Sequence, residues 1–162
     1  MKNFLLTLYS DVMDEIKALY LICEGKRDAE ILHTLLDCKS FQKVYQLPSG
    51  GYGNLSSVAR TIRLMRSPME SNDKIIIAFD ADSLSEQVCN ERIATMRYLT
   101  NADYDKRLGV FCFPPTIEQY LFHADFKELK KDRVILIEYL KKNYDALKDM
   151  DIIKDMQEFI DE

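Results

Sequence analysis

The chain has 162 residues, of which 47% are hydrophobic and 30% are charged, with a formal net charge of -5. This composition excludes an intrinsically disordered chain, and the length suits one domain with a single hydrophobic core. The cysteines lie far apart without a CxxC pair, which favours reduced core thiols over disulfides or zinc ligands: Cys23, Cys38, Cys89 and Cys112.

The first segment, residues 3–17, has apolar side chains at helical spacing and predicts an amphipathic N-terminal helix. Its apolar patch at residues 4–9 is soon interrupted by Asp11, Asp14 and Glu15, so it is too short for a signal peptide or a membrane span. We therefore expect a cytoplasmic protein without a membrane partner.

Strands and helices alternate in the next part of the chain. Buried strands are predicted at residues 18–23, 74–79 and 108–113, a less buried strand at 41–47, and helices at 28–36, 55–65 and 84–99. Strands that alternate with helices at this interval are typical of right-handed crossover units. We therefore expect an α/β, Rossmann-like single domain with about four strands in a mainly parallel sheet flanked by helices.

The C-terminal part is predicted to be helical at residues 116–123 and 126–143, and again in the acidic tail, where apolar residues recur from Leu147 to Ile160. The predicted organisation is an N-terminal helix at 1–17, a catalytic core at 18–122 and C-terminal helices at 123–162. The apolar stripe of the last helix is expected to pack on the core, and a partner protein is the alternative.

Positive charge is concentrated before the third strand. Residues 144–162 have seven acids against two lysines, which accounts for the whole net charge of -5. Between Cys38 and Met69 there is no acid, but there are five basic residues: Lys39, Lys43, Arg60, Arg63 and Arg66. Such a local surface can bind nucleic acid despite the overall charge, and a solvated helix face is the alternative for the arginines.

Acidic residues follow two of the buried strands. Glu24 comes directly after the first strand, Asp28 one helical turn later, and Asp80 and Asp82 after the third. If these strands are neighbours at the switch point of the sheet, the acids face one another, and Asp80 and Asp82 point the same way if the strand stays extended. Hard oxygen ligands suit one or two Mg²⁺ or Mn²⁺ ions and hence phosphodiester chemistry. A helix N-cap at Asp28 and plain strand ends at Asp80 and Asp82 are the alternatives.

A glycine-containing loop follows the second strand. Its glycines allow close approach of the backbone to a phosphate, although a tight loop and an N-cap at Asn54 explain the same residues. Tyr52 is the candidate for stacking on a base. The predicted phosphate or nucleic-acid contacts are Lys26, Arg27, Gly50, Gly51, Asn54, Arg60 and Arg63.

This order of segments resembles the Toprim domain over about residues 18–122. The resemblance rests on Glu24-Gly25-Lys26-Arg27-Asp28, the glycine loop and Asp80-Ala81-Asp82. The domain occurs in topoisomerases, bacterial primases, ribosomal-RNA maturases and the overcoming-lysogenization-defect (OLD) nucleases. Ile117-Glu118-Gln119-Tyr120-Leu121 is similar to the OLD branch, whereas Ser83-Leu84-Ser85 replaces the proline and glycine typical of primases and maturases.

The resemblance implies a metal-dependent nuclease for DNA or RNA in which Glu24, Asp80 and Asp82 are catalytic. Asp28 and Glu118 would add metal ligands, and Glu24 would also act as general acid or base. Full-length OLD proteins contain an ATPase with a GxxxxGK[ST] sequence that is absent here, so an ATPase or another protein is a possible partner, and phage or plasmid defence a possible role. The alternatives are an RNA-processing enzyme of the maturase or primase type and a non-catalytic Toprim subunit that binds a partner protein.

Overall fold

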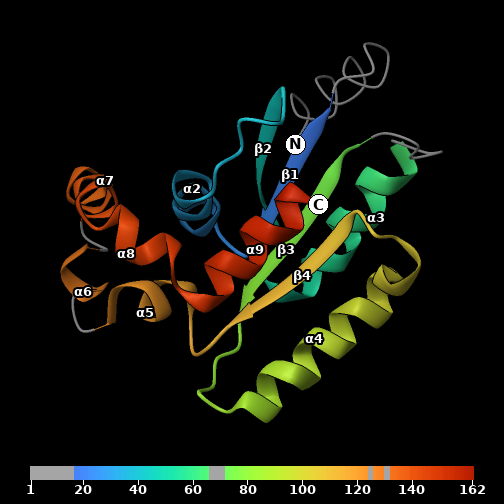
Figure 1. The fold of residues 1–162 in the computed structure, drawn as a ribbon. Helices are drawn as coiled ribbons and strands as arrows, with labels where there is room; N and C mark the ends of the chain where they lie inside the picture. Colours follow the sequence, from blue (N-terminus) through green and yellow to red (C-terminus); the bar gives the residue numbers. More distant parts are fainter. Residues whose placement is uncertain (1–16, 66–71, 124–125, 130–131) are drawn as a thin grey trace.

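A four-stranded parallel sheet forms the centre of the computed structural model, which describes residues 17–65, 72–123, 126–129 and 132–162 (Figure 1). The strands are β1 (Ala18–Cys23), β2 (Lys43–Pro48), β3 (Lys74–Asp80) and β4 (Leu108–Phe113), in the order β2-β1-β3-β4. The predicted α/β class is therefore confirmed. The helix predicted at residues 3–17 lies almost wholly outside the described residues.

Both faces of the sheet are covered, which explains the unbroken apolar sequences of β1 and β3. Leu19 and Leu21 of β1 belong to one core cluster, while Tyr20 and Ile22 belong to the other. Helix α2 (Lys26–Leu35) and the C-terminal helices cover the first face, and α3 (Leu55–Met65) and α4 (Glu86–Thr100) cover the second (Figure 1).

The remaining elements are short 3-10 helices and the C-terminal helices. They are η1 (Tyr52–Asn54), η2 (Ala102–Tyr104), α5 (Ile117–Phe122), α6 (Phe126–Leu129), α7 (Arg133–Lys142), α8 (Tyr144–Lys148) and α9 (Asp151–Asp161). The prediction of one helix over 126–143 is wrong, because Asp132 caps a new helix by accepting a hydrogen bond from Val134 N at 2.8 Å. The acidic tail likewise forms two helices, and its buried residues Ile153, Met156 and Ile160 pack in the protein's own core.

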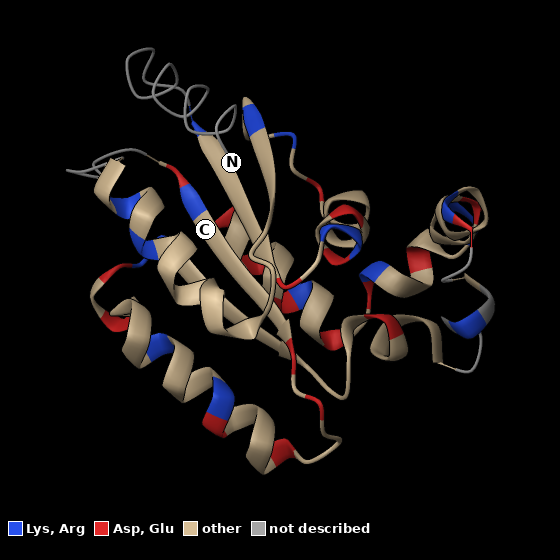
Figure 2. Ribbon diagram, turned by 180° about the vertical axis from the view of Figure 1, so that it is seen from behind, with Lys and Arg blue, Asp and Glu red and all other residues tan. Residues whose placement is uncertain are grey.

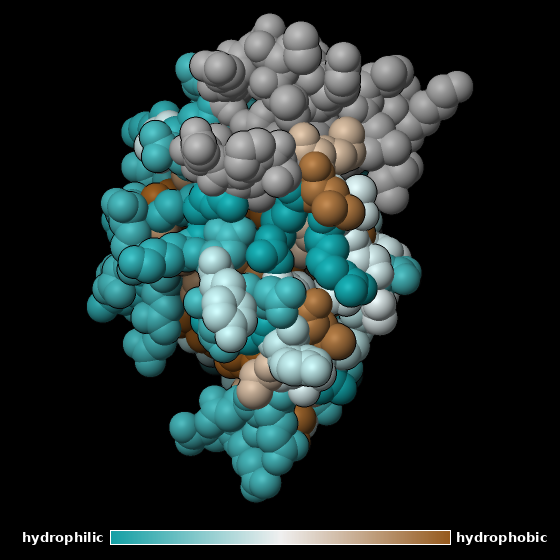
Figure 3. Space-filling view, turned by 90° about the vertical axis from the view of Figure 1, so that its right-hand side faces the viewer, coloured by the Kyte–Doolittle hydropathy of each residue, from teal (hydrophilic) through white to brown (hydrophobic). Residues whose placement is uncertain are grey.

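On the face formed by α3 and α4, hydrophilic residues prevail and apolar side chains form small separate patches (Figure 3). The buried residues of α3, such as Leu55, Ala59 and Ile62, face the sheet instead. In the described part of the chain, no helix has the length and apolar character that a bilayer span requires.

The strand order creates a switch point between β1 and β3. The chain leaves β1 through α2 on one face to reach β2, and then crosses through α3 on the other face to reach β3 on the opposite side of β1. In parallel sheets of this kind, a crevice forms beyond the carboxyl ends of the two strands at the switch point. Glu24 and Asp80 lie at that edge.

Candidate active site at the carboxyl edge of the sheet

Glu24 and Asp80 meet where β1 and β3 end. Glu24 Oε2 accepts a hydrogen bond from the backbone N–H of Asp80 at 3.1 Å. Asp80 Oδ1 in turn accepts one from the N–H of Ile117 at 2.8 Å, at the start of α5. In Figure 2, acidic segments lie at the end of β3 and in the loop that follows it. Hydrogen bonds through these two carboxylates thus link the segments that follow β1, β3 and β4.

The surroundings of Asp80 disfavour its ionised form. Burial is the largest cause that raises the pKa of Asp80 to about 6, against the opposing effect of the hydrogen bond from Ile117 N–H. The charges of Glu24, Asp82 and Glu118 raise that pKa further. Among the described residues, no lysine or arginine forms an ion pair with the side chain of Asp80 or Glu24. Asp80 is therefore a half-buried acid with other acids nearby.

The charges that act on Cys23, at the end of β1, place Asp28 in the same acidic region. Burial raises the pKa of the Cys23 thiol well above its ordinary value, and the charges of Asp28, Asp80 and Glu24 raise it further. Asp28 lies in the first turn of α2, and the N-cap of that helix is Gly25, so the alternative of an N-cap at Asp28 is wrong. A β-carbon added at Gly25 would lie 4.0 Å from Asp28 Oδ2, so this carboxylate sits against the start of the helix.

Asp82 departs from the predicted arrangement. The strand ends at Asp80, and Asp82 has a left-handed backbone with φ of 54°, while its N–H donates to Pro115 O at 2.8 Å. Its carboxylate is 64% exposed and lies 3.7 Å from Arg92 Nη1. The condition on which Asp80 and Asp82 were expected to point the same way, an extended backbone, is therefore not met at Asp82. Within the described ranges, no group of three or more His, Cys, Asp or Glu side chains is arranged to hold a metal ion.

Glu118 is near this region but comes from a different element. It lies in the first turn of α5, whose N-cap is Thr116, with Thr116 Oγ1 accepting from Gln119 N at 3.0 Å. Its charge is among the causes that raise the pKa of Asp80. The charges of Glu24, Asp82 and Glu118 thus act on Asp80, and the charges of Asp28, Asp80 and Glu24 act on Cys23, while a hydrogen bond joins Glu24 directly to Asp80.

The glycine loop is attached directly to the end of β1. Ser49 N–H donates to Cys23 O at 2.8 Å, and Gly50 N–H donates to Glu24 O at 3.2 Å. Gly50 and Gly51 have φ of 79° and 129°, a conformation that other residues rarely adopt. Asn54 Nδ2 donates to Ser49 O at 3.1 Å, so this side chain closes the loop. The predicted loop residues therefore lie beside the carboxylates.

The predicted basic residues are divided between the two edges of the sheet. Lys26 is exposed and Arg27 half-buried at the start of α2, beside Glu24. Arg60 is exposed in the middle of α3. Arg63, in the last turn of α3, lies 3.2 Å from Asp105 and also donates to Thr100 O at the opposite edge. The structure does not bring Arg63 to the carboxylates, because α3 runs back from the carboxyl edge to the amino edge.

Sequence reasoning missed Arg92, the cation that pairs with Asp82. Arg92 Nη1 donates to the backbone oxygen of Asp80 at 3.1 Å, and its guanidinium lies 5.0 Å from the ring centre of Tyr52. The rings of Tyr52 and Phe79 in turn form a T-shaped contact, with ring centres 5.3 Å apart. Tyr52, predicted to stack on a base, thus supports an arginine. The signal was the position of Arg92 in the first half of the helix that follows the acidic loop.

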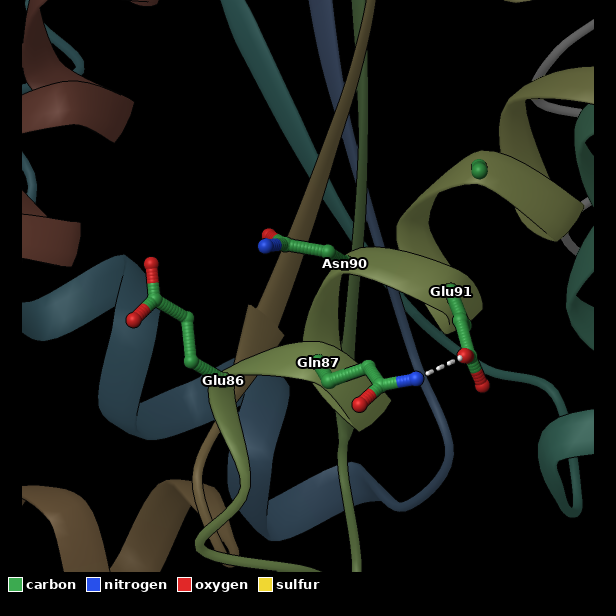
Figure 4. Close-up of a pocket in the computed structure, with 5 residues that line it drawn as sticks. Glu86, Gln87, Asn90 and Glu91 are labelled. Carbon is green, nitrogen blue, oxygen red and sulfur yellow. Dashed lines mark hydrogen bonds between the residues drawn. The ribbon is translucent and has the colours of Figure 1, made fainter.

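A shallow hollow on the outer side of α4 lies apart from these residues (Figure 4). It is lined by Glu86, Gln87, Asn90, Glu91 and Ala94. Gln87 Nε2 donates to Glu91 Oε1 at 3.0 Å, one turn along the helix, as Figure 4 shows. None of the predicted site residues lines this hollow, whose side chains belong to the solvent face of α4.

No family model, curated protein or solved structure matches this chain. The resemblance to Toprim and OLD proteins therefore stays a prediction. The site itself offers hard oxygen ligands, a carboxyl group that titrates close to neutral pH, glycine backbone amides and one arginine, a set that suits the handling of a phosphate group.

Proposed function

We propose that this protein is a divalent-metal-dependent nuclease that hydrolyses phosphodiester bonds in DNA or RNA. The observation that supports this best is the raised pKa of Asp80, about 6, in a half-buried position beside Glu24 and near Asp82 and Glu118. Burial and the neighbouring acids both disfavour the ionised form of Asp80, whose side chain has no ion-pair partner among the described residues, and carboxyl groups with such raised pKa values are concentrated at functional sites. A bound cation would offset both effects.

The carboxylates fit a magnesium or manganese ion of the kind that is bound together with its substrate. Mg²⁺ keeps several water ligands and commonly uses only one or two carboxylates plus substrate phosphates. Glu24 and Asp80 each use one oxygen for a backbone N–H, and among the described residues Glu24 Oε1 and Asp80 Oδ2 have no hydrogen-bond donor. These two residues would hold the ion, and Asp28, Asp82 or Glu118 would join after side-chain movement.

The protein's own groups have distinct parts in the proposed hydrolysis. A bound divalent ion would activate a water molecule and neutralise charge on the phosphate. Glu24, at the same edge, is suited to accept a proton from that water, and Asp80 is suited to ligation only when it is ionised, above about pH 6. Lys26, Arg27 and the loop at Gly50 are suited to hold the phosphates of the substrate strand.

The test is cleavage by the purified protein of supercoiled plasmid, linear DNA and structured RNA with Mg²⁺, Mn²⁺ or EDTA. We expect cleavage that requires the metal and that is lost in Glu24→Gln and Asp80→Asn. Asp103→Asn is the matched control, because Asp103 pairs with Arg97 on the surface at the opposite end of α4.

Metal binding gives an independent readout. Calorimetry with Mg²⁺ or Mn²⁺ should show binding by the wild type and by Asp103→Asn and no binding by Asp80→Asn. The proposal fails if no substrate is cleaved and no metal is bound, or if Asp80→Asn cleaves as fast as the wild type. Metal binding without cleavage would favour a non-catalytic subunit instead.

A further inference from the structure

If the substrate is a nucleic acid, the negative charge at the carboxyl edge of the sheet opposes its binding. Five acids lie there, against Lys26 and Arg27 at the start of α2, so further cations among the acids would help the edge to bind a polyanion. Among the described basic residues, Arg63 forms an ion pair with Asp105 at the other edge. Arg92, in contrast, is held directly over the end of β3.

The side chain of Arg92 is fixed in position before any ligand arrives. Tyr52 supports the guanidinium at 5.0 Å, and the backbone oxygen of Asp80 accepts from its Nη1 at 3.1 Å. The side chain is 32% exposed, so it is partly immobilised but open to solvent. An arginine held in this way loses less conformational entropy when it binds a ligand.

The guanidinium nitrogens of Arg92 that have no partner in the described part of the chain are the ones suited to hydrogen-bond a phosphate. Both of its polar contacts, to Asp80 O and to Asp82 Oδ2, use Nη1. Among the described residues, Nε and Nη2 have no hydrogen-bond partner. These two nitrogens form one side of the guanidinium fork, which matches two oxygens of a phosphate.

The ion pair with Asp82 is of a kind that a ligand can replace. The two groups are 3.7 Å apart, a distance longer than a hydrogen bond, and the Asp82 carboxylate is 64% exposed. Ion pairs in such positions contribute little to stability. A doubly hydrogen-bonded phosphate would compete well with this carboxylate.

We propose that Arg92, supported by Tyr52, binds a phosphate of the substrate at this site. In the absence of substrate, the carboxylate of Asp82 pairs with Arg92 and neutralises part of its positive charge. This inference rests on the proposed nuclease function for its choice of ligand, a phosphate of a nucleic-acid strand. The alternative is a purely structural arginine that attaches α4 to the loop after β3.

The experiment measures binding of a fluorescein-labelled thymidine dodecanucleotide in EDTA, which prevents cleavage. We expect Arg92→Gln to weaken binding about tenfold and to lower the slope of log K against log salt by about 0.7, the value for one phosphate contact on a single strand. Arg92→Lys keeps the positive charge but lacks the guanidinium fork, so its affinity should lie between those of the wild type and Arg92→Gln. Arg97→Gln is the matched control on the same helix, because Arg97 pairs with Asp103.

Asp82→Asn, alone and combined with Arg92→Gln, provides a second test. It deletes the competing carboxylate, so the oligonucleotide should bind several-fold more tightly when Arg92 is present, and most of this gain should be lost in the double variant. If Arg92 is purely structural, the removed negative charge gives the same gain with and without Arg92, and that outcome would overturn the inference. Unchanged binding and an unchanged salt slope in both Arg92→Gln and Asp82→Asn would overturn the inference. If the wild type binds through Arg92 but cleaves nothing with any metal, the nuclease proposal fails and the phosphate site remains.

Discussion

Two aspartates at opposite edges of the same sheet have opposite surroundings. Asp105, before β4 at the amino edge, lies 3.2 Å from Arg63 and 2.9 Å from Arg107. Burial opposes its ionisation, but hydrogen bonds and charge from Arg107 and the charge of Arg63 lower the pKa of Asp105 below its ordinary value. Asp80, at the carboxyl edge, has a pKa raised to about 6, first by burial and then by the charges of its acidic neighbours.

The difference separates a structural carboxylate from a candidate functional one. The amino edge encloses the negative charge of Asp105 with two arginines, so that charge stabilises the fold. The carboxyl edge leaves its charge without such compensation, so the ionised form of Asp80 destabilises the fold. Burial alone does not tell the two apart, and the charge of the neighbours does.

The largest effect is expected at the amino edge. Asp105→Asn removes the partner of Arg63 and Arg107, which are only 22% and 23% exposed, and should lower the free energy of unfolding. Breaking a fully buried pair costs about 3–5 kcal/mol, and partial exposure of these arginines reduces the expected loss to about 2–3 kcal/mol. Urea unfolding at pH 7 measures it, with Asp103→Asn as the control. A loss no greater than in that control would remove the contrast between the edges.

Asp80→Asn should have the opposite sign. The folded-state pKa of Asp80, about 6, lies above its ordinary value of 3.8, so the folded protein binds the proton more tightly. The stability this group contributes is present below about pH 4 and is lost as the pH rises through 6. The variant, which cannot ionise, should therefore exceed the wild type by about 1–2 kcal/mol above pH 6, after allowance for solvent screening.

The measurement is the free energy of unfolding of both proteins between pH 4 and pH 7. The advantage of Asp80→Asn should grow between pH 4 and pH 6 and then stay constant. Asp105→Asn gives the reverse comparison, because the stabilisation from Asp105 is lost as the pH falls through its lowered pKa. An advantage of Asp80→Asn that does not change with pH would show that burial and the neighbouring acids do not raise the pKa of Asp80 in the folded protein.

Magnesium should reduce the difference between the edges, if the proposed function holds. An ion that binds only the folded state stabilises it by about 1 kcal/mol when its free concentration is about five times its Kd. We expect this gain in the wild type and in Asp105→Asn, which keep the acids at the carboxyl edge, and no gain in Asp80→Asn. Thermal unfolding with and without Mg²⁺ measures it, and an equal gain in all three proteins would indicate binding elsewhere.

Much of this architecture could be predicted from sequence. Strands in a parallel sheet are buried on both faces and need unbroken apolar runs, which is why residues 18–23, 74–79 and 108–113 were predicted correctly. The adjacency of Glu24 and Asp80 followed from the switch point between the first and third strands. Both inferences depend on patterns that extend over many residues.

The direction of individual side chains could not be predicted. Asp82 departs from the extended strand because it adopts a left-handed backbone, which no apolar pattern signals. Arg63 and Arg92 look equivalent in sequence, but each helix starts at the carboxyl edge and runs back, so Arg92, in the first half of α4, reaches the end of β3 and Arg63, in the last turn of α3, does not. The position of a basic residue along its helix was the better guide.

The smallest effect is expected for Asp82→Asn, which tests whether acids at the carboxyl edge contribute to the fold through Arg92. The pair is 3.7 Å apart and 64% exposed on the aspartate side, so its loss should change the free energy of unfolding by less than about 0.5 kcal/mol. Asparagine tolerates the left-handed backbone at this position, φ of 54°, as well as aspartate does, so the substitution adds no strain. Asp82→Ala, which lacks that tolerance, separates the backbone effect from the charge effect. A loss in Asp82→Asn as large as in Asp105→Asn would mean that Arg92 neutralises the carboxyl edge as Arg63 and Arg107 neutralise the amino edge, and the distinction between a structural and a functional carboxylate would no longer hold.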